Sequence, residues 1–168
     1  DGSYTFRAVT RDTGGNQATS TGIALTIDNT APVATSIAST TSTSSATITW
    51  STAEAATSTV QYGTTPSFGS QATSSATSTH SVTLSGLSEN TLYYFRITSI
   101  DALGNLGTST TAQFRTTDGT PPNITSIASS TTYATATVSW NTNEAATSTI
   151  QYGLTTSYGS QATSSGTT

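Results

Sequence analysis

The sequence has no cysteine and no lysine, and only 7% of its 168 residues are charged. Without cysteine there are no disulfides or thiolate metal sites, which fits a cytoplasmic protein or a bacterial surface protein that folds without disulfides. Eight carboxylates against four arginines give a formal net charge of -4. Because the arginines stand singly along the chain, the clustered cations of a phosphate-binding face are missing, and we expect no nucleic-acid partner.

Long apolar runs are also absent. None approaches the about 20 residues of a membrane-spanning helix, and no charged segment followed by an apolar one opens the chain as a signal peptide would. The chain begins without methionine and, as its repeat indicates, inside a domain. We therefore expect no membrane insertion in this segment, and we expect any signal or anchor to lie outside it.

Threonine and serine supply the polar surface instead, at roughly four residues in ten. Apolar residues alternate with polar ones, as at Ile48 and Trp50 and again at Tyr93, Phe95 and Ile97. Alternation with a period of two indicates strands with one buried face, and the β-branched side chain of threonine suits the outer face.

Clusters of Gly, Pro, Asn, Asp and Ser separate these runs about every eight to twelve residues, which is typical of an antiparallel β-sandwich. The one stretch compatible with a helix, Thr52–Thr57, is too short to form one alone and is predicted to be a turn. One complete domain is predicted to contain seven strands: Val33–Ser39, Ala46–Ser51, Thr57–Tyr62, Ser70–Ser74, His80–Ser85, Leu92–Ile100 and Thr108–Thr116.

The chain also repeats itself. Residues Ala46–Ser75 return as Ala136–Ser165, an offset of about 90 residues, and Tyr4–Arg7 mirrors Tyr93–Arg96. The predicted fold class is therefore all-β, with tandem seven-stranded antiparallel β-sandwiches of which only the middle one is complete. We place the boundaries at two short proline-containing joints, which gives the closing hairpin of a preceding domain at 1–29, a complete domain at 30–117 and the opening half of a following domain at 118–168.

Two motifs of the middle unit carry a resemblance to a known family. Trp50 stands in the second predicted strand, where fibronectin type III domains place their core tryptophan, and Trp140 repeats it. The run Gly86–Tyr93 is similar to the family's Gly-Leu-x-Pro-x-Thr-x-Tyr corner, with Glu89 in place of the proline. The resemblance implies a β-sandwich in which the hydroxyl group of Tyr93 bonds to nearby backbone.

The stretches Thr57–Ser70 and His80–Ile97 are most similar to the bacterial subgroup that includes the non-catalytic N-terminal domain of purple acid phosphatases. Residues 1–16 are equally similar to the end of a bacterial Ig-like repeat. A binuclear metallophosphatase needs a cluster of His, Asp and Asn ligands, whereas this chain has one histidine. We therefore expect that this segment is not an enzyme.

The titratable residues are the candidates for a catalytic or metal-binding site. His80 has no cysteine or second histidine with which to share a metal and no recognisable nucleophile motif, so we expect it to be exposed at the start of a strand. Glu54 and Glu144 occupy equivalent places in two repeats, which argues against the paired carboxylates of a glycosidase. Each is predicted to be a loop carboxylate that accepts backbone hydrogen bonds.

The loops Asp12–Asn16 and Asp101–Asn105 offer oxygen atoms that could touch Ca²⁺, but they lack the further acidic positions of a helix-loop-helix calcium site. We interpret them as hairpin turns in which Gly and Asn adopt left-handed φ. Calcium at the joints that begin at Asp28 and Asp118 stays an open alternative. We assign no catalytic, cofactor-binding or metal-binding residue and expect no cofactor.

The sequence thus predicts a non-catalytic spacer or adhesion module of a tandem array, in a secreted or surface-attached bacterial protein and hence extracellular or at the cell surface. Expected partners are neighbouring repeats, and carbohydrate or protein at the cell surface. The aromatic residues Tyr94, Phe68 and Tyr158 could stack on a sugar ring, although packing at a strand edge is the preferred interpretation.

Two alternatives remain open. The domains could be accessory modules of a large secreted hydrolase that acts on phosphoesters or polysaccharides, or subunits of a self-associating filament or surface layer. The opening hairpin and the final strands each leave a sheet edge and half a core uncovered, so we also expect the 168-residue chain to associate or to fray at both ends.

Overall fold

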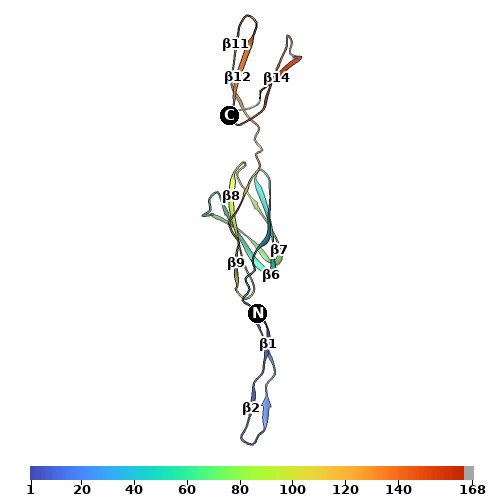
Figure 1. Ribbon diagram of the computed structural model, residues 1–168, viewed down its shortest axis with the longest axis vertical. Helices are drawn as coiled ribbons and strands as arrows, with labels where there is room; N and C mark the ends of the chain where they lie inside the picture. Colours follow the sequence, from blue (N-terminus) through green and yellow to red (C-terminus); the bar gives the residue numbers. More distant parts are fainter. Residues whose placement is uncertain (165–168) are drawn as a thin grey trace. The chain divides into compact units, whose positions relative to one another are not determined.

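The computed structural model describes residues 1–164, and every regular element in that range is a β-strand (Figure 1). The predicted all-β fold is therefore confirmed. The chain divides into two compact units, residues 1–119 and residues 120–168. No helix with the length and apolarity of a membrane span occurs in the described range.

The middle sandwich contains six strands: β5 (Thr35–Thr41), β6 (Ser45–Gly63), β7 (Ser70–Ser85), β8 (Leu92–Ile100), β9 (Leu106–Thr108) and β10 (Ala112–Arg115). Strand β6 pairs antiparallel with β5, β7 and β8, and β8 in turn pairs with β9 and β10. The seven predicted segments all contribute strands, but β6 and β7 each join two of them, and the last one divides into β9 and β10.

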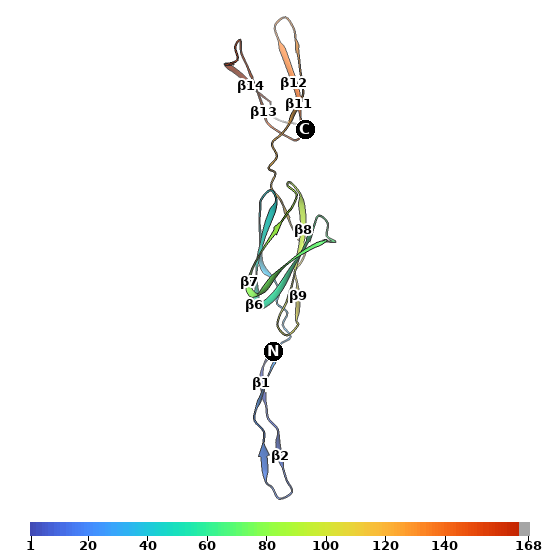
Figure 2. The same cartoon turned by 180° about the vertical axis from the view of Figure 1, so that it is seen from behind.

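Strands β6 and β7 run through both layers of the sandwich (Figures 1 and 2). In one layer, residues 45–51 of β6 pair with β5 and with residues 79–85 of β7. In the other layer, residues 57–63 of β6 pair with residues 70–74 of β7 and with β8. The two layers of the sandwich are thus joined by continuous strands that cross from one to the other.

The crossing in β6 takes the place of the predicted turn at Thr52–Thr57, and that prediction is wrong. The ladder with β7 shifts register on both sides of Ala56, which marks a β-bulge. Thr52, Ala56 and Ser58 are buried, so the alternation of inward and outward side chains continues through the bulge. The segment contains no glycine or proline to reverse the chain, and its threonines favour extended backbone.

The core lies between the two layers. Its large members are almost fully buried, and Ile48, Val60 and Ile97 are 0% exposed while Trp50 is 2% exposed. Full burial of such side chains stabilises the fold by about 1.5–3 kcal/mol each. The remaining core residues come from every strand of the sandwich except β5 and β9, and from the corner before β8: Ala46, Val82, Leu84, Leu87, Tyr93, Phe95 and Phe114.

The corner predicted from the family resemblance is present. The hydroxyl group of Tyr93 accepts a hydrogen bond from the backbone N–H of Ser88 at 3.0 Å, and the Tyr93 ring stacks on Phe114 with 5.5 Å between centroids. Gly86 has φ +70, a left-handed conformation that suits glycine. Glu89, which stands where the family has proline, accepts a hydrogen bond from the N–H of Gly119 at 3.1 Å and so ties the corner to the end of the domain.

Residues 1–27 form a hairpin with two ladders, in which β1 (Gly2–Phe6) pairs with β4 (Ile23–Ile27) and β2 (Val9–Arg11) pairs with β3 (Gln17–Thr19). The described part of the second unit consists of two further hairpins. In the first of these β11 (Ile124–Thr131) pairs with β12 (Ala136–Thr142), and in the second β13 (Ser148–Tyr152) pairs with β14 (Ser160–Ser164).

Replacing Tyr93 with phenylalanine should lower the free energy of unfolding of the middle domain by about 1 kcal/mol, because the N–H of Ser88 loses its acceptor. The measurement is urea unfolding followed by tryptophan fluorescence in a Trp140→Phe background, so that Trp50 alone reports. Tyr94→Phe, on the opposite face of β8, is the matched control and should change stability by less than about 0.5 kcal/mol. Equal losses in the two variants would contradict the role of the corner.

Candidate functional site

His80 is buried, and the prediction that it would be exposed is wrong. It is 2% exposed and lies opposite Trp50 in the β6–β7 ladder, with the two rings stacked at 4.8 Å and 3°. Its Nδ1 lies 3.0 Å from the hydroxyl of Ser74 and its Nε2 lies 3.2 Å from the hydroxyl of Thr52. This contact could not be predicted from the sequence, because only the register of β6 on β7 brings His80 to Trp50.

The hydrogen bonds around His80 suit a neutral ring. Because the Thr52 hydroxyl donates to the Glu54 carbonyl at 2.6 Å, Nε2–H donates to Thr52 and Nδ1 accepts from Ser74. Burial lowers the pKa of His80 below its ordinary value of 6.5, although a hydrogen bond with the Thr77 backbone opposes the shift. The histidine is thus a neutral packing partner of Trp50, with both nitrogens in use.

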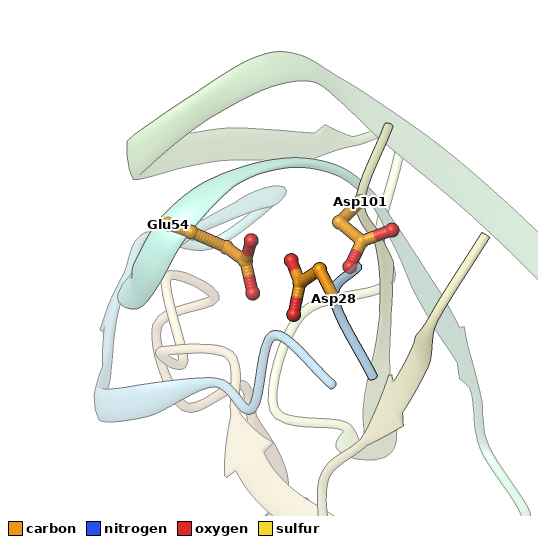
Figure 3. A group of neighbouring side chains, drawn as sticks. All are labelled: Asp28, Glu54 and Asp101. Atoms are coloured by element: carbon orange, nitrogen blue, oxygen red, sulfur yellow. The ribbon is translucent and has the colours of Figure 1, made fainter. Parts of the chain in front are cut away.

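Three carboxylates meet at one end of the sandwich (Figure 3). Asp28 directly follows β4, Glu54 lies at the bulge of β6, and Asp101 directly follows β8. Each contributes an oxygen atom, and these atoms all lie within 4.8 Å of one another. Glu54 therefore lies in a strand and faces two carboxylates, whereas the sequence predicted a loop residue that accepts backbone hydrogen bonds.

Asn105 holds two members of the trio in place. Its side-chain amide donates to Asp101 Oδ2 at 2.7 Å and to the backbone carbonyl of Asp28 at 3.1 Å. Asp101 Oδ1 also accepts the backbone N–H groups of Leu103 and Asn105 at 2.8 and 2.9 Å. The Asp101–Asn105 loop thus connects the middle sandwich to the chain that enters it.

The Asp12–Asn16 loop has the same internal bonds, with the side-chain amide of Asn16 on Asp12 Oδ2 at 2.8 Å. Both loops are hairpin turns, as predicted, and Gly15 and Gly104 adopt positive φ. Asn16 and Asn105 do not have positive φ. Their side-chain amides donate hydrogen bonds to Asp12 and Asp101.

The pKa values of Glu54 and Asp101 shift in opposite directions. Partial burial raises the pKa of Glu54 above its ordinary value of 4.5, and the charges of Asp28 and Asp101 and a hydrogen bond with Asp28 add to the shift. For Asp101 partial burial acts in the same direction, but the hydrogen bonds from Asn105, Leu103 and Gly104 outweigh it and hold the pKa below 3.8. Of these two carboxyl groups, Glu54 therefore takes up a proton more readily than Asp101.

Carboxylate oxygens suit hard cations such as Ca²⁺, which takes about six to eight oxygen ligands. The trio offers three carboxylates, and the oxygens of Asp101 already accept hydrogen bonds from their own loop. The cluster alone therefore does not define a metal site, and calcium at the joint stays an open alternative.

The convergence of the three acids was not predicted from the sequence. The sequence does show that all three acids recur about 90 residues away: Asp28 as Asp118, Glu54 as Glu144 and Asp101 as Asp12. What could not be read from the sequence is which loops and bulges share one end of the sandwich.

The aromatic candidates are also placed. Phe68 is partly buried beneath Arg96, whose guanidinium carbon lies 5.2 Å from the ring centroid, and this agrees with packing at a strand edge. Tyr94 is partly buried on the outer face of β8. Tyr158, in the second unit, is 53% exposed.

Comparison with known proteins gives a family and two similar folds. Residues 32–116, which contain strands β5 to β10, match the family described as purple acid phosphatase, N-terminal domain. The crystal structure of the FN1–FN3 domains of chicken CNTN1 is 17% identical, with 69% of this chain and 43% of that chain covered and a TM-score of 0.45. The FN5 domain of Drosophila Lar is 15% identical, with 52% and 99% covered and a TM-score of 0.40. No curated relative matches the sequence.

Glu54→Gln should raise the urea midpoint of the middle domain at neutral pH, because it removes one of three converging negative charges. Since the folded-state pKa of Glu54 is raised, the wild-type free energy of unfolding should increase as pH falls through the range above 4.5, and the advantage of the variant should vanish in acid. Unfolding is followed by Trp50 fluorescence in the Trp140→Phe background, with EDTA present to remove divalent cations. Glu144→Gln removes the same charge from the second unit and should leave this midpoint unchanged, whereas a lower midpoint for Glu54→Gln would contradict the repulsion.

His80→Gln tests the buried histidine through its pH dependence. Because the folded-state pKa of His80 is lowered, the unfolded chain takes up the proton first as pH falls through 6.5, and wild-type stability is lost with a slope of at most about 1.4 kcal/mol per pH unit. The stability difference between wild type and variant should therefore shrink between about pH 7.5 and about pH 5. A difference that stays constant over this range would show that His80 does not titrate as described.

Proposed function

The chain belongs to the purple acid phosphatase N-terminal domain family, and on that premise we propose that it is a non-catalytic spacer and adhesion segment from a tandem array. We place this array in a secreted or surface-attached bacterial protein. The segment holds other parts of that protein at a distance from the surface, with neighbouring repeats as its partners in the chain and carbohydrate or protein as its partners outside it.

The recurrence of one structural unit carries this proposal. The pair Ser58 and Ser74 of the β6–β7 ladder returns as Ser148 and Ser164 in the β13–β14 ladder, in the same register. The joint at 118–122 contains two adjacent prolines, which restrict the backbone between successive units. Repeated folded units with short stiff joints are suited to spanning distance.

The chemistry of the middle domain supports the same role. His80 is packed against Trp50, and Asp101, one of the three converging carboxylates, accepts a hydrogen bond from Asn105 of its own loop. The outer face is covered mainly by threonine and serine hydroxyl groups, such as those of Thr47 and Thr83, which bond to each other at 3.0 Å across two strands. Such a surface is hydrated and nearly uncharged, which suits a spacer module.

A second candidate function is favoured by the family match itself. The matching family is named for the N-terminal domain of an enzyme, so the array could be an accessory part of a secreted hydrolase. That candidate predicts a catalytic domain with metal or acid residues in the same open reading frame, whereas the spacer proposal predicts further repeats and an anchor.

The primary test is surface display. An antibody raised against the 168-residue protein should label intact, unpermeabilised cells of the bacterium that encodes it, and a protease added outside the cells should release its peptides. An antibody against a cytoplasmic protein is the control and should label permeabilised cells only. Labelling that appears only after permeabilisation would overturn the proposal.

A further inference from the structure

The two outer faces of the middle sandwich present different side chains. On one layer the outward residues are small and uncharged, such as Thr47, Thr49, Ser81 and Thr83. The other layer is built from residues 57–63 of β6, residues 70–74 of β7, β8 and β10, and its outward residues include two cations, one aromatic ring and three amides. We call this surface the arginine face, and it is made up of Gln61, Gln71, Tyr94, Arg96, Gln113 and Arg115.

The charges of the middle domain are separated. Both arginines of residues 30–119 lie on the arginine face. The acids of the same range lie at the two ends of β8, with Glu89 and Asp118 by the corner that precedes this strand and Glu54 and Asp101 in the trio at its end. Because complementary charge selects a partner, the arginine face suits an anionic group.

The guanidinium group of Arg96 is held in place by two neutral side chains. It donates from Nη2 and Nε to Gln61 Oε1 at 2.7 and 3.2 Å, and its carbon atom lies 5.2 Å from the centroid of the Phe68 ring. Among the described residues these contacts leave the Nη1 group for a ligand. A planar guanidinium that is already oriented recognises a carboxylate through paired, charge-assisted hydrogen bonds.

The loop after β6 brings Phe68 to this position at a cost in backbone strain. Gly63 faces outward, and a Cβ atom on it would lie 2.7 Å from the carbonyl oxygen of Phe68, so the loop folds back over this glycine. Phe68 has φ 58, a left-handed conformation that is rare for an aromatic residue. Tyr158 has φ 55 and the same approach to Gly153, so both repeats keep the strained loop. Strain of this kind favours a functional role for the aromatic support beneath the arginine.

Tyr94 lies on the same face as Arg96, two residues earlier in β8 and therefore about 7 Å away along the strand. It is partly buried, and its neighbours across the strands are Gly63 and Gln113. The C–H face of a pyranose ring packs on such an aromatic ring, and amide groups such as that of Gln113 bond to sugar hydroxyl groups. A ring, amides and one oriented cation thus lie within the reach of one sugar residue that carries a carboxylate.

We propose that the arginine face binds a uronic acid residue of an acidic polysaccharide, with the sugar ring on Tyr94 and its carboxylate on Arg96. Gln113 and the exposed Arg115 extend the face along β10 and contact the hydroxyl groups of the same sugar residue or of the next one. The inference rests on the carbohydrate partner of the proposed function and gives its chemical class. The amide and hydroxyl groups around Arg96 favour a sugar over a peptide carboxylate.

The N-terminal hairpin supplies a matched control for this site. By the repeat, Arg7 corresponds to Arg96, but Thr5 stands where the middle domain has Tyr94. Arg7 is exposed as well. Arg7→Gln therefore removes the same charge from the chain without changing the arginine face.

Amide NMR titration of the 168-residue protein with methyl β-D-glucuronide, methyl β-D-glucoside and acetate tests the inference. The glucuronide should shift signals of β8 and β10 on the arginine face and should bind at least about tenfold more tightly than the other two probes. Arg96→Gln should weaken glucuronide binding by roughly tenfold and leave the response to the glucoside unchanged. Tyr94→Thr, which copies the hairpin, should weaken binding of both sugars by roughly fivefold. Arg7→Gln should change none of these results.

Three outcomes would overturn the inference. With no shift on the arginine face there is no site, with equal affinity for glucuronide and glucoside the carboxylate is not recognised, and with acetate bound as tightly as the glucuronide the sugar is not recognised. If Arg96→Gln loses its dispersed amide spectrum, Arg96→Lys replaces it, keeps the charge without the planar fork and should weaken glucuronide binding by a smaller factor. These outcomes do not alter the surface labelling of intact cells, so failure of this inference and failure of the proposed function are distinguishable.

Discussion

The constraint on which the middle domain depends is the unbroken alternation of β6. Its inward side chains, from Ala46 to Val60, fill the space between the two layers, and its backbone pairs with three different strands. Because the bulge bends this strand across the sandwich, one run of sequence supplies both walls of the core. The position of Trp50 on β6 then determines where His80 can lie, and the bulge determines where Glu54 can lie.

The sequence predicted most of the strands because period-two alternation is a local property. It also predicted the corner at Tyr93, because the motif places a hydroxyl group beside its own preceding backbone. The turn at Thr52–Thr57 and the exposed position of His80 were wrong for one shared reason. Whether such a segment turns or continues as a bulge depends on pairing with residues more than 20 positions away, and local composition carries no information about that pairing.

The carboxylate trio shows the same division between local and distant information. The Asp101–Asn105 bonds are local, occur again at Asp12–Asn16, and follow from the loop sequence. The approach of Glu54 and Asp28 depends on the crossing of β6 and on where the preceding hairpin ends. Burial and, after it, the charges of Asp28 and Asp101 raise the pKa of Glu54, whereas the hydrogen bonds from its own loop stabilise the charge of Asp101 and hold its pKa low.

The hairpin of residues 1–27 has the same strand registers as β8 to β10, yet β8 and β10 occupy the middle domain. Two differences between the copies favour the resident strands. Ile97, which is 0% exposed in the core, corresponds to Ala8, and Phe114 corresponds to Leu25. The hairpin therefore buries less apolar volume than the strands that it would replace, and β8 and β10 gain further from belonging to the same domain.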